Sequence, residues 1–164
     1  MRRTSRNRAG GFALIEAAIA TMVLLIAVTG TIAFNQYSMI DIYKSQTRTD
    51  ACMLGSVIME CWQGQGGSTS FNPVNNLSAS ILNCSDMDVR TSWIGPGVPS
   101  GFTLVWNLYP YYRITTNSVM YRVALSYRYI NGKKFLNVRV SWPSSMGGTF
   151  VESNKFVGIT ECLN

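Results

Sequence analysis

The chain has 164 residues, of which 47% are apolar and 13% are charged, with 14 Lys and Arg, 8 Asp and Glu, 4 Cys and no His. This length suits one domain with a hydrophobic core, and the apolar content excludes an intrinsically disordered chain. The lack of histidine excludes His-based triads, His-ligated metal sites and the usual general base near neutral pH. Four of the basic residues precede residue 9, so most of the net charge of +6 lies at the N-terminus and the body is almost neutral.

An apolar segment follows the basic N-terminus. Residues Phe12 to Phe34 contain a single charged residue, Glu16. A helix of this length would span roughly 34 Å, which is enough to cross the hydrocarbon core of a bilayer. The arginines before it, with no further Lys or Arg until Lys44, predict a cytoplasmic N-terminus and an exported body. The length of the segment and the lack of a small-x-small site disfavour a cleaved secretory signal peptide, and a plain signal anchor stays open as an alternative.

The lone carboxylate is the most informative feature of this segment. A carboxylate deep in hydrocarbon costs at least about 2.5–3.5 kcal/mol on insertion scales. Glu16 lies five residues into the span, near the cytoplasmic interface, where the cost is smaller but still calls for a partner. The string GGFALIE at residues 10–16 follows a basic leader and opens an uninterrupted apolar run. This pattern resembles the class III signal of type IV pilins and of type II secretion pseudopilins. The resemblance covers residues 1–40 closely and is only architectural beyond them.

The resemblance implies a role for three residues. A prepilin peptidase in the inner membrane would cut between Gly11 and Phe12, and the new amine of Phe12 would be N-methylated. Glu16 would pair with the Phe12 ammonium of a neighbouring pilin subunit, which makes a buried carboxylate tolerable. The implied function is a structural subunit of a bacterial type IV pilus-like filament, with a minor pilin preferred. The alternatives are a type II secretion pseudopilin, a DNA-uptake pilin and a monomeric membrane-anchored periplasmic domain.

The helix is expected to continue past the apolar segment. Residues 35–63 contain no proline and include an apolar stripe with 3-4-3 spacing that should face a sheet. The stripe consists of Ala51, Leu54, Ile58 and Cys61, and Gly64, Gly66 and Gly67 should end the helix. The expected organisation is a cleaved leader at 1–11, a transmembrane assembly helix at 12–35, an amphipathic continuation at 36–63, a connecting loop region at 64–101 and a sheet at 102–164.

One hairpin is well specified in the last of these regions. Val119–Ile130 and Phe135–Trp142 both alternate in polarity and flank Asn131-Gly132, a strong signal for a two-residue turn. That turn predicts four apolar cross-strand pairs on one face, namely Tyr127–Leu136, Leu125–Val138, Val123–Val140 and Tyr121–Trp142. The opposite face is expected to be solvated, and it carries Arg122, Ser126, Arg128, Asn137 and Arg139.

Further strands should complete the sheet. They are expected at Phe102–Tyr109, at Tyr112–Thr116, and at either Phe150–Val151 or Phe156–Thr160. The predicted fold class is α+β and pilin-like. A long N-terminal helix, half transmembrane and half amphipathic, would pack on an antiparallel sheet of about four strands.

Four cysteines, Cys52, Cys61, Cys84 and Cys162, follow the apolar segment on the expected exported side, where disulfides form. On a continuous helix, Cys52 and Cys61 would be ~13 Å apart along the axis and half a turn out of phase, so they cannot bond to each other. We prefer the pairs Cys61–Cys84 and Cys52–Cys162, and the exchanged pairing stays open.

Sequence patterns give no support for an enzyme. The chain has no Walker loop, no dinucleotide-binding glycine motif and no closely spaced cysteine pairs, so we expect no catalysis, no cofactor and no metal. Asp86 and Asp88 weakly resemble half of a calcium site. Arg122, Arg128 and Arg139 would share one strand face and could attract DNA, but a solvated sheet face is the preferred interpretation.

Overall fold

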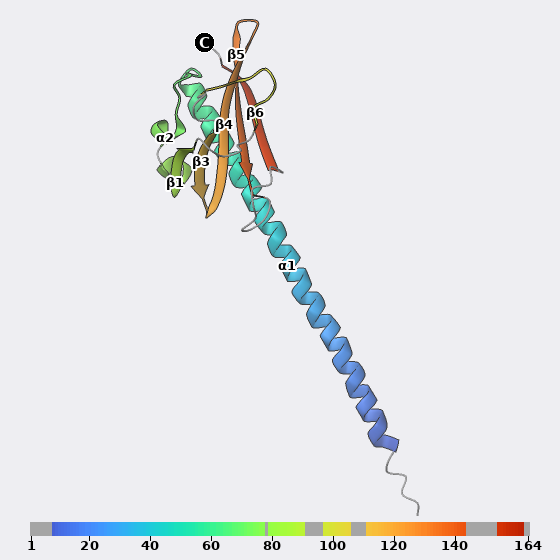
Figure 1. Cartoon of the computed structure of the whole chain (residues 1–164). Coiled ribbons are helices and arrows are strands. Elements are labelled where there is room, and N and C mark those ends of the chain that lie inside the picture. The colour runs from blue at the N-terminus through green and yellow to red at the C-terminus, as the bar shows by residue number, and fades with distance from the viewer. Residues whose placement is uncertain (1–7, 78, 91–96, 106–110, 144–153, 163–164) are drawn as a thin grey trace, which may run out of the picture. The chain divides into compact units, whose positions relative to one another are not determined.

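The computed structural model describes residues 8–77, 79–90, 97–105, 111–143 and 154–162 (Figure 1). The chain divides into two compact units, residues 1–43 and residues 44–164, which are described separately below. The helices are α1 (Arg8–Gly64), α2 (Pro73–Asn76) and α3 (Ala79–Leu82). The strands are β1 (Asp86–Arg90), β2 (Thr103–Leu104), β3 (Tyr111–Thr116), β4 (Val119–Ile130), β5 (Lys133–Trp142) and β6 (Asn154–Cys162).

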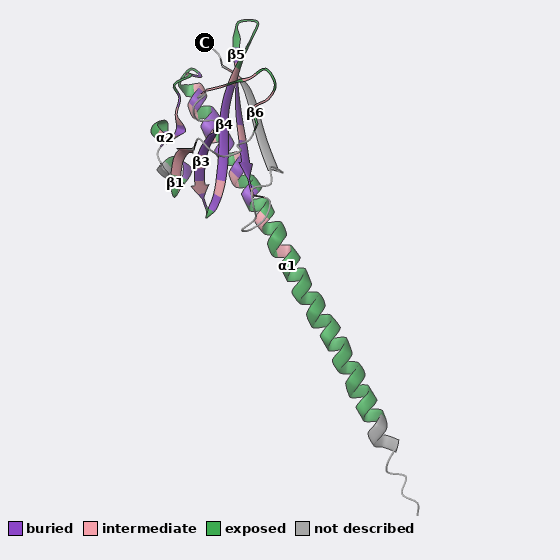
Figure 2. Cartoon of the chain, in the orientation of Figure 1, coloured by how far each residue is buried: buried purple, intermediate pink, exposed green. Residues whose placement is uncertain are grey.

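The first unit consists of the N-terminal part of α1. Its large apolar side chains are exposed, from 79% for Phe12 to 47% for Val28 (Figure 2). The segment is rich in Leu, Ile, Val and Ala. By length and hydropathy, α1 is long and apolar enough to cross a membrane. This agrees with the single apolar helix predicted from the sequence.

The second unit begins with the part of α1 that follows Tyr43. It continues as helix through the polar residues 44–50, and the predicted stripe then faces the sheet, with Ala51, Leu54 and Ile58 buried and Cys61 half-buried. Polar contacts also join this helix segment to the β3–β4 hairpin. Tyr121 donates from its hydroxyl to the carbonyl of Thr47 at 3.4 Å, and Asn117 Nδ2 donates to Asp50 Oδ2 at 2.9 Å.

Helix α1 ends where the glycines were expected to end it. Gly66 and Gly67 both adopt φ of 63°, in the left-handed region that glycine enters without steric cost. The amide of Gly67 donates to the carbonyl of Trp62 at 3.0 Å, which satisfies one of the last carbonyls of the helix.

All strands pair antiparallel in one sheet of order β1-β3-β4-β5-β6, and β2 pairs with β4 beyond the end of β3. The predicted hairpin register is confirmed for Tyr127–Leu136, Leu125–Val138 and Val123–Val140. Asn131 has φ of 52° and Gly132 has φ of 80°, as a type I′ turn requires. The rings of Tyr121 and Trp142 also lie close, with centroids 6.5 Å apart.

The sheet is larger than the predicted set of about four strands. Strand β1 lies in the region expected to be a connecting loop, where Met87 and Val89 alternate with aspartates, and α2 and α3 lie there as well. The strand expected at Phe102–Tyr109 is reduced to Thr103–Leu104 within the described part of that range. Strand β6 includes the expected Phe156–Thr160, whereas Phe150–Val151 falls outside the described residues.

The prediction of a solvated second sheet face is wrong for Arg122, Ser126 and Asn137, which are buried. Residues of the segment that precedes β2 contact this face. Arg139 Nη1 donates to the carbonyl of Gly97, and a Cβ atom on Gly101 would lie 3.1 Å from Arg128 Nη1. The buried polar groups also contact one another, with Ser126 Oγ and Asn137 Oδ1 3.1 Å apart, so burying this face leaves these two groups hydrogen-bonded.

Candidate functional site

The candidate site is the exposed face of α1 that contains Glu16. Phe12 and Glu16 lie one helical turn apart, and together with Ile15, Ile19 and Ala20 they line a shallow hollow on the helix surface. Glu16 is exposed, and its neighbours on this face are apolar. The carboxylate is therefore presented on a surface that has no other charge.

The sequence explains why Glu16 lacks a cation on the adjacent turns of its own helix. No Lys or Arg occurs between Arg8 and Lys44, so the basic groups before and after lie about two and eight turns away along α1. The predicted cleavage point, after Gly11, lies inside α1, which begins at Arg8 in the uncut chain. Cleavage there would create an ammonium group on Phe12, one turn from the carboxylate.

The threonines of this helix need no outside partner. Thr21 donates from its hydroxyl to the carbonyl of Ala18 at 2.9 Å, Thr29 donates to that of Leu25 at 2.8 Å, and Thr31 donates to that of Ala27 at 2.8 Å. Such bonds to the preceding turn satisfy hydroxyl groups in an apolar environment. Within residues 12–34, Glu16 is the one charged side chain, and the other polar side chains are these three threonines.

The preferred disulfide pairing is not formed in this structure, because Cys52, Cys61 and Cys84 are free thiols. Cys84 Sγ donates to the carbonyl of Leu82, two residues earlier, at 3.5 Å. Burial raises the pKa of Cys84 from 9.0 to about 11, so its thiolate is even less populated at pH 7 than that of an ordinary cysteine. The side chain of Cys162 lies outside the described residues.

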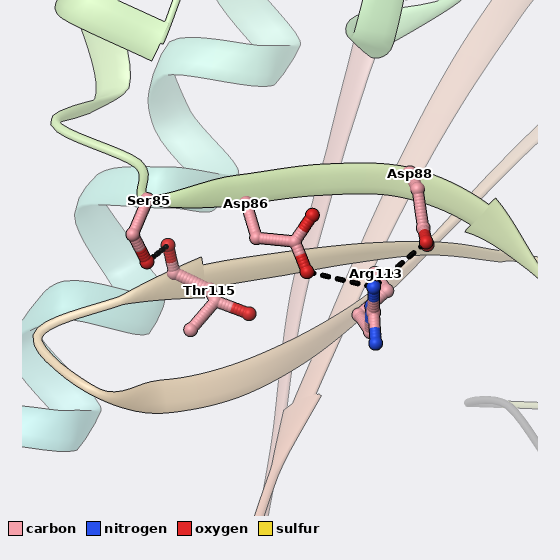
Figure 3. Close-up of polar contacts among 5 residues, drawn as sticks. All are labelled: Ser85, Asp86, Asp88, Arg113 and Thr115. Carbon is pink, nitrogen blue, oxygen red and sulfur yellow. Dashed lines mark hydrogen bonds and ion pairs between the residues drawn. The ribbon is translucent and has the colours of Figure 1, made fainter.

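The two aspartates of β1 are engaged by an arginine of β3 (Figure 3). Arg113 Nη2 lies 2.7 Å from Asp86 Oδ2 and 2.7 Å from Asp88 Oδ2. Next to them, Ser85 Oγ donates to the carbonyl of Thr115 at 3.2 Å. The guanidinium occupies the position where a calcium ion would have to bind both carboxylates, so the calcium interpretation of this pair is corrected to an ion-paired strand contact.

The arginines considered for DNA binding do not form one exposed surface. Arg122 is only 6% exposed, and its guanidinium lies 5.9 Å from the centre of the Tyr111 ring. Arg139 is half-buried and bonded to Gly97, which leaves Arg128 as the exposed member of the three. Phosphate contacts require accessible cations, so this face lacks the row of basic groups that the DNA interpretation needs.

Sequence reasoning missed a buried lysine beneath the β4–β5 hairpin. Lys134 Nζ donates to the carbonyl of Gly67 and lies 4.8 Å from the centre of the Tyr127 ring, which fixes the hairpin to the segment that follows α1. The alternation of side chains along β5 could have predicted this burial, because Lys134 falls on the same face as the buried Leu136. The adjacent Lys133 pairs with Glu161 at 2.8 Å.

Comparison of the chain with protein-family models, curated proteins and solved structures found no match. The structure supports an α+β arrangement in which the C-terminal part of α1 packs on an antiparallel sheet. The functional assignment is therefore carried by the chemistry of α1 rather than by relatives.

Proposed function

We propose that the chain is a minor pilin, a structural subunit of a bacterial type IV pilus-like filament that assembles through α1. The observation that carries the proposal is the position of Glu16, the one carboxylate in a long exposed apolar segment, one turn from Phe12. In the precursor this helix anchors the chain in the inner membrane, and in the filament it packs against the same helix of other subunits.

The energetics of the carboxylate favour a partner made by processing. A bilayer alone leaves Glu16 uncompensated. The cost is about 2.5–3.5 kcal/mol for an acidic group at the bilayer centre and is smaller near the interface, where Glu16 would lie as the fifth residue of the apolar segment. Cleavage after Gly11 by a prepilin peptidase frees the amine of Phe12, and N-methylation leaves its positive charge in place. A neighbouring helix that is staggered by one turn brings its own Phe12 ammonium beside Glu16, and the two charges then compensate each other in a low-dielectric environment.

The second unit suits the exported part of such a subunit. Its core consists of apolar residues shared by α1 and the sheet, among them Leu54, Ile58, Val123 and Val138. It therefore has a core that does not include the apolar segment at 12–34. A type II secretion pseudopilin would use the same N-terminal segment in the same way. This segment therefore does not distinguish a pilus from a type II secretion pseudopilus, and the distinction comes from the machinery that assembles the filament.

Intact-mass measurement of the protein isolated from membranes and from sheared filaments tests this proposal. The expected mass lacks residues 1–11 and carries one added methyl group. A peptidase-deficient strain supplies the matched control, in which the mass should correspond to the uncut and unmethylated chain. A full-length mass in the competent strain would contradict the proposal and would favour a monomeric membrane-anchored domain.

A further inference from the structure

Two residues farther along the same helix differ sharply in size. Gly30 lies in mid-helix, where glycine costs about 1 kcal/mol relative to alanine, and a Cβ atom placed on it would meet no other atom within 4 Å. Phe34, one turn later, presents a ring that is 70% exposed. The helix therefore presents a gap and a large apolar projection about 6 Å apart along its axis.

The gap and the projection repeat the geometry of the proposed charge pair. The sequence separation from Phe12 to Gly30 is 18 residues, and the separation from Glu16 to Phe34 is also 18. At 3.6 residues per turn this is five whole turns, about 27 Å along the axis. Gly30 thus lies on the helix face of Phe12, and Phe34 lies on the face of Glu16, within the first unit.

We infer that the ring of Phe34 packs into the gap at Gly30 of a second copy of this chain. The inference rests on the proposed function, because it uses the one-turn stagger that brings Glu16 of one copy level with Phe12 of the next. With that stagger, Phe34 of the first copy is level with Gly30 of the second and faces it. A residue without a side chain lets the ring approach the neighbouring backbone, as small residues do at close helix contacts.

A polar ligand at Gly30 would not explain the flanking residues as well. The hydroxyls of Thr29 and Thr31 already donate to carbonyls of their own helix, so the surface around the gap offers no unsatisfied donor. A role as a bending point is also disfavoured, because α1 continues without interruption from Arg8 to Gly64. A contact with an apolar projection accounts for both the missing side chain and the exposed ring.

Site-specific photocrosslinking in cells that assemble the filament tests the inference. Phe34 is replaced by the photoreactive analogue benzoylphenylalanine, which preserves an aromatic ring, and crosslinked peptides are mapped by mass spectrometry. The expected product joins residue 34 of one copy to the turn around Gly30 of another. The analogue placed at Ile32, which lies on the opposite side of the helix, is the control and should give no product at Gly30.

A pair of substitutions adds an independent measurement. Gly30→Leu fills the gap and should lower the assembled fraction about tenfold, since overpacked contacts are strongly unfavourable. Thr29→Leu adds similar bulk to the same turn on another face and should assemble as the unaltered chain does. A protein that is cleaved and assembled normally, yet crosslinks elsewhere, to a different protein, or not at all, would overturn the inference while leaving the proposed function intact. An uncut, unassembled chain would instead reject the proposed function.

Discussion

The rings of Trp62 and Phe71 stack with their centroids 6.0 Å apart and their planes 14° apart. Trp62 also donates from its indole Nε1 to the carbonyl of Ser68 at 2.9 Å, and both rings are fully buried. This contact joins the last turn of α1 to the segment that follows it, in addition to the glycine cap. It shows that the end of the helix is fixed by apolar packing as well as by backbone hydrogen bonds.

Trp62→Ala should be strongly destabilising, because it removes the stacked ring and leaves a large cavity beside Phe71. We expect a loss of about 3–5 kcal/mol in the free energy of unfolding, measured by urea denaturation. Met53→Ala, at an exposed position of the same helix, is the control and should change it by less than about 0.5 kcal/mol. Equal effects of the two changes would show that the stacked pair does not stabilise the domain.

Gly132→Val should weaken the β4–β5 hairpin. A β-branched residue at φ of 80° is strained, and we expect a loss of about 1–2 kcal/mol in unfolding free energy. Lys133→Ala tests the adjacent residue, whose exposed ion pair with Glu161 contributes about 0–1 kcal/mol. If Gly132→Val leaves the denaturation midpoint unchanged, then the type I′ geometry is not required.

Stability at alkaline pH should depend on Tyr112. Burial raises the pKa of Tyr112 from 10.0 to about 12, and its hydroxyl has no hydrogen-bond partner among the described residues. The unfolded state loses the proton first, so this residue contributes stability below pH 10 that disappears as the pH rises towards 12.

Tyr112→Phe removes the titrating hydroxyl and should therefore lose less stability than the parent chain between pH 10 and pH 12. Thermal unfolding of both proteins across this range measures the difference, and the other tyrosines contribute equally to each. Identical pH profiles would mean that Tyr112 ionises normally in the folded state.

Gly11→Val should block processing of the N-terminus. The proposed cleavage follows Gly11, and a branched side chain at that position would obstruct a protease site that accepts a small residue. Only the uncut precursor should be detected by intact mass, whereas Gly11→Ala, which keeps a small residue, should still be cut. Normal removal of residues 1–11 in the valine variant would place the cut elsewhere.

Glu16→Ala should impair the proposed incorporation into a filament without unfolding the second unit, residues 44–164. Glu16→Gln preserves the shape but not the charge, so it should fail to the same degree if ion pairing with the Phe12 ammonium is the role of the carboxylate. Sheared-filament yield measures incorporation, and the thermal midpoint of the domain should stay within about 2 °C of the parent. Full incorporation of the glutamine variant would refute the charge-pairing role.

The sequence contained enough to predict α1 and the β4–β5 hairpin, because both arise from local rules. Uninterrupted apolar periodicity specifies the helix, and Asn131-Gly132 with alternating strands specifies the register. The lack of a cation next to Glu16 on its own helix could also be predicted locally, because the sequence has no Lys or Arg between Arg8 and Lys44.

Other features depend on contacts between distant segments and could not be predicted in this way. Strand β1 is short and contains two aspartates, and the arginine that contacts them, Arg113, lies 25 residues after Asp88. The burial of Arg122 and Asn137 depends on segments that cover the second sheet face, so their polar character suggested solvent exposure. The contact of the Cys84 thiol with the carbonyl of Leu82 likewise cannot be specified by the spacing of cysteines along the chain.

Strand β4 is held by a two-residue turn at each end. Asn117 and Ser118, with φ of 49° and 61°, close the β3–β4 hairpin as Asn131 and Gly132 close the next one. This three-stranded meander therefore forms from neighbours in the chain, and its low contact order should let it form early in folding. The edge strands β1 and β6 pair with β3 and β5 across longer stretches of chain, so they should form later. Amide hydrogen exchange should therefore be slowest in β4 and faster at both edges of the sheet.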